Sequence, residues 1–234
     1  MSWIEHLHAD VDALVASVVQ RVEDATREAI AARGRAVLAL AGGRTPLPAY
    51  RQLATRTIDW RKVVAMPTDE RCVPHEHPAC NLREMRTALA AADGLRFESL
   101  TTADGDPVHS QTQAREMLMR HPQAFDAVVL GMGHDAHTAS LFPGATNLAS
   151  ALDPGSAVDA CRIDPDPPPV EAPFPRITLT AARLLRARSL HLVITGEGKH
   201  EVLRQAQASH DPLHHPIAAL LHAPEAMVHI HWSA

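Results

Sequence analysis

The sequence predicts an α/β protein of the doubly wound class, with helices on both faces of a mostly parallel sheet. Short, apolar, β-branched runs alternate along the chain with segments whose apolar residues recur at helical spacing. Several of these runs stop at glycine-rich turns, at residues 42–43, 131–133 and 196–198. Open α/β sheets bind ligands at the carboxyl ends of their strands, so these turns mark a candidate site.

The N-terminal half begins with a helical pattern. From Ile4 to Ala32 apolar residues recur at helical spacing, which predicts one amphipathic helix or two, ending at Gly34. Buried strands are expected at residues 35–41, 62–66 and 98–101. Further helices are expected at residues 46–53, 81–92 and 108–120.

The C-terminal half continues the alternation from a central strand at residues 126–130. Further strands are expected at residues 157–163, 189–195 and 227–231. Helices are expected to start within residues 138–142 and at residues 181, 196 and 216. The proline-rich section 153–175 is incompatible with a regular helix or a central strand, and predicts a rigid excursion long enough to cap a site.

Length and composition favour a single domain spanning residues 1–234. The chain has 46% apolar and 21% charged residues, enough to bury a full-sized core. Its net charge of −5 provides no basic surface for nucleic acid or anionic membranes. Three cysteines without CxxC spacing fit a reducing compartment, and no signal-like segment or membrane-length apolar run is evident. We therefore expect a soluble cytoplasmic protein, a monomer or weak homo-oligomer, without nucleic acid or membrane partners.

The most informative stretch covers residues 130–144, Leu-Gly-Met-Gly-His-Asp-Ala-His-Thr-Ala-Ser-Leu-Phe-Pro-Gly, and places Asp135 and His137 just past the central strand. It closely resembles the signature of the glucosamine-6-phosphate isomerase/6-phosphogluconolactonase family, in its lactonase branch. The resemblance implies a Rossmann-like fold of the isomerase/lactonase type. Two positions depart from the family pattern. His134 replaces an acidic residue, and Ala136 replaces a glycine, so Ala136 is strained if that position needs a positive φ.

A second glycine turn has the features of a phosphate site. A strand, the turn at Gly42 and Gly43, and a helix started by Pro46 bring backbone N–H groups and the positive end of a helix dipole together. Taken alone, the turn is more simply a tight connection. The family has a similar Ser-Gly-Gly-Ser-Thr-Pro loop that binds the sugar phosphate, which implies this role for both glycines and Thr45. Arg44 replaces the second serine, and it either reaches the phosphate or points into solvent.

Three further segments gain a role only through the resemblance. The Asp69-Glu70-Arg71 run is by itself a solvated loop with a local ion pair. The family pattern implies Asp69 as a second carboxylate near the substrate and Arg71 as a substrate-binding cation. Arg176 matches the arginine that contacts the phosphate in the family, and Lys199 matches its phosphate lysine.

The resemblance implies hydrolysis of a sugar-phosphate δ-lactone, a small-molecule substrate. An imidazole, whose ordinary pKa is near ~6.5, is suited to take a proton from water and return it to the ring oxygen, a role that falls to His137. Either Asp135 or Asp69 is expected to orient the imidazole. The scheme needs no metal and no cofactor, and the histidines and cysteine within residues 75–80 match no familiar zinc spacing.

Two other functions stay open. In the isomerase/deaminase branch the loop after the histidine carries a glutamate, but residues 138–142 contain no acid, which favours the lactonase. A non-catalytic sugar-phosphate sensor is the second alternative, and no helix-turn-helix or basic segment supports it. The remaining histidines show no ligand spacing and are expected at the surface or in packing contacts, among them His6, His8, His121, His214, His215, His229 and His231.

Overall fold

The computed structural model describes residues 3–170 and 172–234. Within them the strands form a seven-stranded parallel sheet, in the order β1-β10-β9-β6-β2-β3-β5, and a small antiparallel sheet, β4-β8-β7. The large sheet contains β1 (Trp3–His8), β2 (Ala36–Leu40), β3 (Val63–Pro67), β5 (Arg96–Phe97), β6 (Ala127–Leu130), β9 (Leu190–Thr195) and β10 (Val228–Ser233). The small sheet contains β4 (Asp69–Arg71), β7 (Ala160–Ile163) and β8 (Arg176–Leu179).

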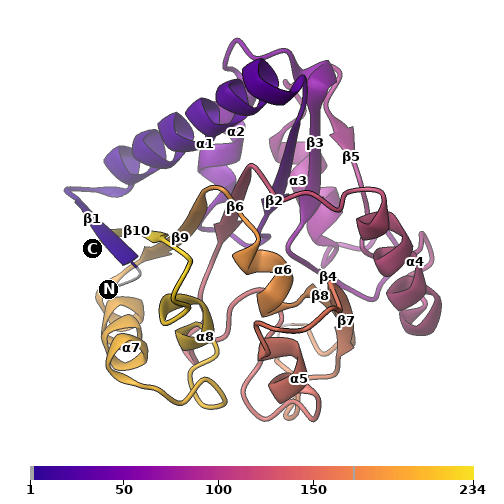
Figure 1. Ribbon diagram of the computed structural model, residues 1–234, viewed down its shortest axis with the longest axis vertical. Coiled ribbons are helices and arrows are strands. Elements are labelled where there is room, and N and C mark those ends of the chain that lie inside the picture. Colours follow the sequence, from indigo (N-terminus) through magenta and orange to yellow (C-terminus); the bar gives the residue numbers. More distant parts are fainter. Residues whose placement is uncertain (1–2, 171) are drawn as a thin grey trace.

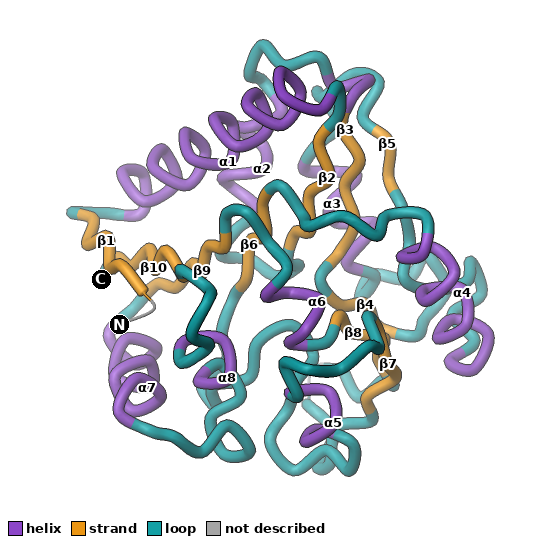
Figure 2. Tube along the Cα trace, in the orientation of Figure 1, coloured by secondary structure: helices purple, strands orange, loops and turns teal. Residues whose placement is uncertain are grey.

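Helices lie on both faces of the large sheet, which confirms the predicted fold class (Figure 1). The helices are α1 (Val11–Arg33), α2 (Leu47–Ala54), α3 (Asn81–Ala88), α4 (Pro107–Met119), α5 (Leu148–Leu152), α6 (Ala181–Leu185), α7 (Glu197–Ala208) and α8 (Ala218–Leu221). A short 3₁₀ helix, Trp60–Lys62, precedes β3. Figure 2 shows the small sheet set apart from the large one, among the loops that follow β3 and precede α6.

The core is divided into two layers by the alternation of side chains along each strand. In β2, Leu38 and Leu40 belong to the cluster that includes buried residues of α1, α2 and α3. Val37 and Ala39 of the same strand belong to the cluster that includes residues of α4 to α8. A strand buried on both faces has no polar positions, which is why β2 reads as a continuous apolar run.

The N-terminal segment corrects one prediction. The helical pattern begins at Val11, and the residues before it form β1, paired in parallel with β10. Asp10 separates the two elements, because its Oδ1 accepts the backbone N–H of Ala13 at 2.8 Å and caps α1. Ile4 and Leu7 are three residues apart and so fit a helical pattern, although both are exposed on this edge strand.

Two other expected elements are also wrong in place or type. The strand expected at residues 98–101 is β5, two residues long and shifted to Arg96–Phe97. The helix expected to start within residues 138–142 does not form; that segment is a turn with a bridge between Thr138 and Leu141. Ala139 has φ 48°, in the left-handed region, and this conformation interrupts a right-handed helix.

Among the described residues, five histidines form a row across β1, β10 and β9: His6, His8, His191, His229 and His231. Ring nitrogens of His191 and His231 lie 3.2 Å apart. Burial, and then the positive charge of neighbouring groups, lowers the pKa of His191 to about 3 and that of His231 to about 2. These contacts confirm a packing role for His6, His8, His229 and His231.

No helix in the described part of the chain has the length and apolar character needed to cross a lipid bilayer.

Candidate active site

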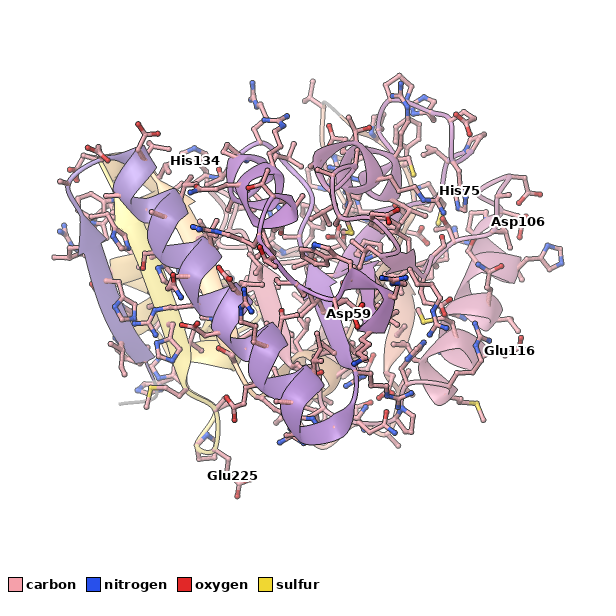
Figure 3. The ribbon with its side chains drawn as sticks, turned by 90° about the horizontal axis from the view of Figure 1, so that it is seen from above. Asp59, His75, Asp106, Glu116, His134 and Glu225 are labelled. Atoms are coloured by element: carbon pink, nitrogen blue, oxygen red, sulfur yellow. The ribbon has the colours of Figure 1, made fainter. Side chains whose placement is uncertain are left out.

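The loops that carry the expected site residues leave the large sheet at one edge. They follow β2, β3, β6 and β9, whose carboxyl ends lie together because these strands are parallel neighbours. Figure 3 shows His134, after β6, at the opposite edge of the molecule from Glu225, in the loop that enters β10. These loops and the small sheet enclose a cavity of about 310 Å³. The described residues lining it include Gly42, Gly43, Arg44, Thr45, Asp69, Arg71, His137, Arg176 and Lys199.

His137 and Asp135 form a close pair just after β6. Nδ1 of His137 lies 2.5 Å from Oδ1 of Asp135, and the backbone N–H of His137 donates to the same oxygen over 3.2 Å. Burial tends to raise the pKa of Asp135, but the hydrogen bond and charge of His137 outweigh it and hold that pKa below its usual range. Asp135, rather than Asp69, is therefore the carboxylate in contact with the imidazole.

The backbone of this loop explains why the pair can form. The N–H of Gly133 donates to the carbonyl of His137 at 2.9 Å and closes the turn. A Cβ on Gly133 would lie 2.2 Å from Nδ1 of His137 and 2.6 Å from Oδ1 of Asp135, so the pair can keep this geometry only while position 133 has no side chain. Ala136 is buried with φ 60°, a conformation that costs a non-glycine residue ~1–2 kcal/mol. The strain foreseen at this departure from the family pattern is therefore present.

Asp69 lines the cavity from the start of β4 and is 7% exposed. Its Oδ2 accepts a 2.5 Å hydrogen bond from the hydroxyl of Ser140, and its Oδ1 accepts a longer one, 3.3 Å, from Thr68. The backbone N–H of Ser140 donates to Oγ1 of Thr178, which lies opposite Asp69 in the β4–β8 pair. The signature loop thus fixes the orientation of this second carboxylate.

Arg71 and Arg176 enter the cavity from directly paired positions of β4 and β8. Arg71 donates to the carbonyl of Ala79 and Arg176 to that of Ala172, at 2.8 and 2.9 Å. Both Nε groups are buried and have no acceptor among the described residues. Burial lowers the pKa of Arg176, the charge of Asp69 opposes this, and that of Arg71 adds to it. Two neighbouring guanidinium groups with unused donors favour an anionic ligand.

Lys199 and Arg44 add positive charge to the same cavity. Lys199 lies in the first turn of α7, and burial followed by the charge of Arg44 lowers its pKa. Among the described lining residues four are cationic, Arg44, Arg71, Arg176 and Lys199, whereas Asp69 is the carboxylate. This excess of positive charge matches a multiply charged anion such as a phosphate monoester.

The glycine turn after β2 is shaped by Asn81. A Cβ on Gly42 would lie 2.1 Å from Oδ1 of Asn81, so the close approach requires glycine. Asn81 donates from Nδ2 to the carbonyl of Asp69 at 2.8 Å, and its Oδ1 has no donor among the described residues. Behind it, buried Glu70 accepts the backbone N–H groups of Asn81 and Leu82 at the start of α3. Burial raises the pKa of Glu70 to about 7, although these N–H groups oppose the shift.

Comparison with known proteins identifies the family. The model of the family described as glucosamine-6-phosphate isomerases/6-phosphogluconolactonase matches residues 9–232. The chain belongs to this family. A 6-phosphogluconolactonase of Rhizobium meliloti is 36% identical over 241 residues, covering 100% of both chains. A 6-phosphogluconolactonase of Pseudomonas putida is 38% identical over 229 residues, covering 97% of this chain and 91% of that relative.

Solved structures of the family share the fold. A crystal structure of a 6-phosphogluconolactonase from Shewanella baltica matches with a TM-score of 0.92 and 34% identity, over 99% of this chain and 97% of that chain. A structure described as a putative 6-phosphogluconolactonase from Neisseria gonorrhoeae matches with a TM-score of 0.89 and 29% identity, over 99% and 100%.

Some residues around the family site were not singled out from the sequence. The hydroxyl of Ser140 holds Asp69, Thr178 accepts the backbone N–H of Ser140, and Phe142 packs against His137. Ser140 lies in the recognised signature, but its partners, Asp69 and Thr178, come from strands of the small sheet, whose pairing the sequence did not reveal. Asn81 begins α3, as the sequence predicted, but its contact with Gly42 was not predicted.

The described residues contain no group of three or more histidine, cysteine, aspartate or glutamate side chains suited to hold a metal ion. Within residues 75–80, His75 contacts Thr101 and the thiol of Cys80 contacts Glu70.

Proposed function

We propose that this member of the family hydrolyses 6-phospho-D-glucono-1,5-lactone to 6-phosphogluconate, a step of the oxidative pentose phosphate pathway. The observation that carries the proposal is the juxtaposition in one cavity of a carboxylate-bound imidazole and a cluster of cations. A lactone with a phosphate at its far end needs both, a base at the ester carbon and cations at the phosphate. The names of the relatives support the same substrate class.

The first step is removal of a proton from water. Because Asp135 has a lowered pKa, it is ionised and can only accept a hydrogen bond. The proton between the two residues therefore belongs to Nδ1 of His137, which leaves Nε2 unprotonated and able to act as a base. Nε2 takes a proton as the water oxygen attacks the lactone carbonyl carbon. Asp135 stabilises the imidazolium that results, and general base catalysis of this kind contributes typically ~10²–10⁴-fold.

The second step opens the ring. The tetrahedral intermediate collapses, the bond from carbon to the ring oxygen breaks, and the imidazolium of His137 returns its proton to that oxygen. The products are a carboxylic acid, which ionises, and the freed hydroxyl group. Neither step uses a metal or a cofactor.

The cations and the glycine turn of the cavity are proposed to hold the phosphate. Its proposed ligands are Gly42, Gly43, Arg44, Thr45, Arg71, Arg176 and Lys199. Binding the phosphate so far from the reacting carbon places the carbonyl near the base and converts binding energy into orientation. Asp69, fixed by Ser140, is proposed to accept a hydrogen bond from a sugar hydroxyl and so orient the ring.

The first test compares hydrolysis of freshly made 6-phospho-D-glucono-1,5-lactone with its spontaneous opening, for the wild type and His137→Ala. We expect acceleration by the wild type that collapses in the folded variant. If the wild type binds the phosphosugar without accelerating hydrolysis, the lactonase proposal is wrong. Release of ammonia from an amino sugar phosphate then indicates the isomerase/deaminase, and binding without any turnover indicates a sensor.

The proposal also includes the domain organisation, cellular location and oligomeric state of the enzyme. The large sheet takes strands from both ends of the chain, β1 and β10, which supports a single domain over residues 1–234. We propose a cytoplasmic monomer or weak homo-oligomer, and size-exclusion chromatography with light scattering tests the oligomeric state.

A further inference from the structure

A stack of three side chains joins the imidazole to one of the cations. The ring of Phe142 lies against that of His137, with ring centroids 4.1 Å apart and planes 27° apart. Cζ of Arg176 lies 5.0 Å from the centroid of the same phenyl ring. The described lining of the cavity includes His137 and Arg176 but not Phe142, which is 7% exposed. The phenyl ring therefore contacts two residues of the site but is not itself part of the described cavity lining.

A single hydrogen bond does not fix the plane of an imidazole. The contact with Asp135 holds Nδ1 of His137 in place, yet the ring can still turn about that bond. Packing against an aromatic face removes this freedom, because tilting the ring separates the two π-surfaces. The plane of the ring decides where the lone pair on Nε2 points, so the phenyl contact controls the direction of proton transfer.

Arg176 gives Phe142 a rigid support from the small sheet. Arg176 is 3% exposed, and its guanidinium donates to the carbonyl of Ala172. A buried guanidinium over a phenyl ring is a favourable cation–π contact. Arg176 belongs to β8, whereas His137 follows β6, so the stack also fixes the distance between the base and a cation of the phosphate site.

We propose that Phe142 is a positioning residue that sets the plane of the His137 ring. Through its contact with Arg176, it also fixes the position of that ring relative to a proposed phosphate ligand. The inference rests on the proposed function, since it assigns His137 as the base and Arg176 as a phosphate ligand. Phe142 makes no contact with substrate. It determines how efficiently a bound lactone reacts rather than how tightly it binds.

The test compares Phe142→Leu, which keeps an apolar side chain but removes the aromatic face, with Phe142→Tyr, which keeps that face. For Phe142→Leu we expect kcat on the phosphorylated lactone to fall ~10–100-fold, as expected for a misplaced base, with KM within ~3-fold of wild type. Phe142→Tyr should stay within ~3-fold in both constants. Phe97→Leu is the matched control, because Phe97 also lies under an arginine, Arg86, but is not among the described residues lining the cavity. Its kcat should match the wild type.

An NMR measurement makes the test independent of turnover. The ring protons of His137, assigned by their loss in His137→Ala, should move when Phe142→Leu removes the phenyl ring current, and should stay near their wild-type positions in Phe142→Tyr. A wild type that does not hydrolyse the lactone overturns the proposed function, while the NMR result still decides whether Phe142 sets the imidazole. The positioning role is overturned if folded Phe142→Leu keeps the wild-type kcat or changes only in KM. It is also overturned if Phe142→Tyr does not keep kcat near the wild-type value, or if the His137 signals do not move in Phe142→Leu.

Discussion

Replacing Gly133 by alanine directly tests the geometry of His137, the proposed base. The added Cβ would lie 2.2 Å from Nδ1 of His137 and 2.6 Å from Oδ1 of Asp135, far inside any permitted contact. Gly133 does not have a positive φ, so alanine brings no backbone strain of its own. The atoms in the way are the ends of side chains, and the side chain of His137 is 28% exposed, so it can turn away. We therefore expect Gly133→Ala to fold and to separate the pair.

The expected effects on stability and on catalysis differ in size. Turning His137 away forfeits its contact with Phe142, worth ~0.5–1.5 kcal/mol, and a partly exposed ion pair worth ~0.2–1 kcal/mol. Unfolding free energy should therefore fall by no more than ~2.5 kcal/mol. Loss of the positioned base should lower kcat by ~10²–10⁴-fold, which is ~2.7–5.4 kcal/mol of activation free energy.

Urea unfolding and initial rates of lactone hydrolysis measure these two effects. The control is the same substitution made in the His137→Ala background, where the imidazole that alanine displaces is already gone. There Gly133→Ala should leave the residual kcat unchanged, because two changes that remove one function do not add. A Gly133→Ala enzyme with wild-type stability and more than a third of wild-type kcat would show that the base does not act from this position.

Three further predictions follow from buried charge and backbone strain. Lys199→Gln should raise KM by ~10-fold or more with kcat within ~3-fold, because a charged hydrogen bond to the phosphate is lost in ground and transition states alike. Below pH ~6.5 the folded protein binds fewer protons at His191 and His231 than the unfolded chain does, so each histidine adds up to ~1.4 kcal/mol of stability for each unit by which the pH rises. Glu70 acts in the opposite direction, because its raised pKa keeps it protonated in the folded protein above pH ~4.5, and it removes up to ~1.4 kcal/mol per pH unit. Urea unfolding from pH 5 to 6 should therefore show stability rising by up to ~1.4 kcal/mol, and by about twice as much in Glu70→Gln; a flat wild-type profile contradicts this. Ala136→Gly relieves ~1–2 kcal/mol of backbone strain, but it loses ~0.8 kcal/mol from a buried methyl group and ~0.4–1 kcal/mol because glycine gives the unfolded chain more conformational entropy. The unfolding free energy should therefore change by less than ~1 kcal/mol, and a loss above ~2 kcal/mol refutes this balance.

The order of strands and glycine turns was enough to predict where the site lies. Parallel strands that end in glycine turns bring those turns to one edge, and residues 42–43, His137 and Lys199 do line one cavity there. The family pattern supplied Asp69 and Arg176, which periodicity alone left in loops. The choice between Asp135 and Asp69 as the partner of the imidazole depended on loop geometry, which no spacing rule specifies.

Other features were beyond the sequence for physical reasons. Ile4 and Leu7 fit a helical pattern as well as an exposed edge strand, so β1 was merged with α1. The turn at residues 138–142 depends on Ala139 in a left-handed conformation, which alanine rarely adopts and propensity cannot anticipate. The contact of Phe142 with Arg176 needs β8 to pair with β4, a long-range event.

The small sheet explains how two distant parts of the chain make one site. The loops after strands of the large sheet carry the proposed base and the glycine turn, but Arg71 and Arg176 belong to β4 and β8. Ser140 links the two units, since its backbone N–H donates to Thr178 of β8 and its hydroxyl to Asp69 of β4. A loop bonded to both strands is coupled to the paired arginines, so the distance between the proposed base and the proposed phosphate ligands is set before substrate arrives. Such preorganisation lets phosphate binding be used for orientation rather than for assembling the site.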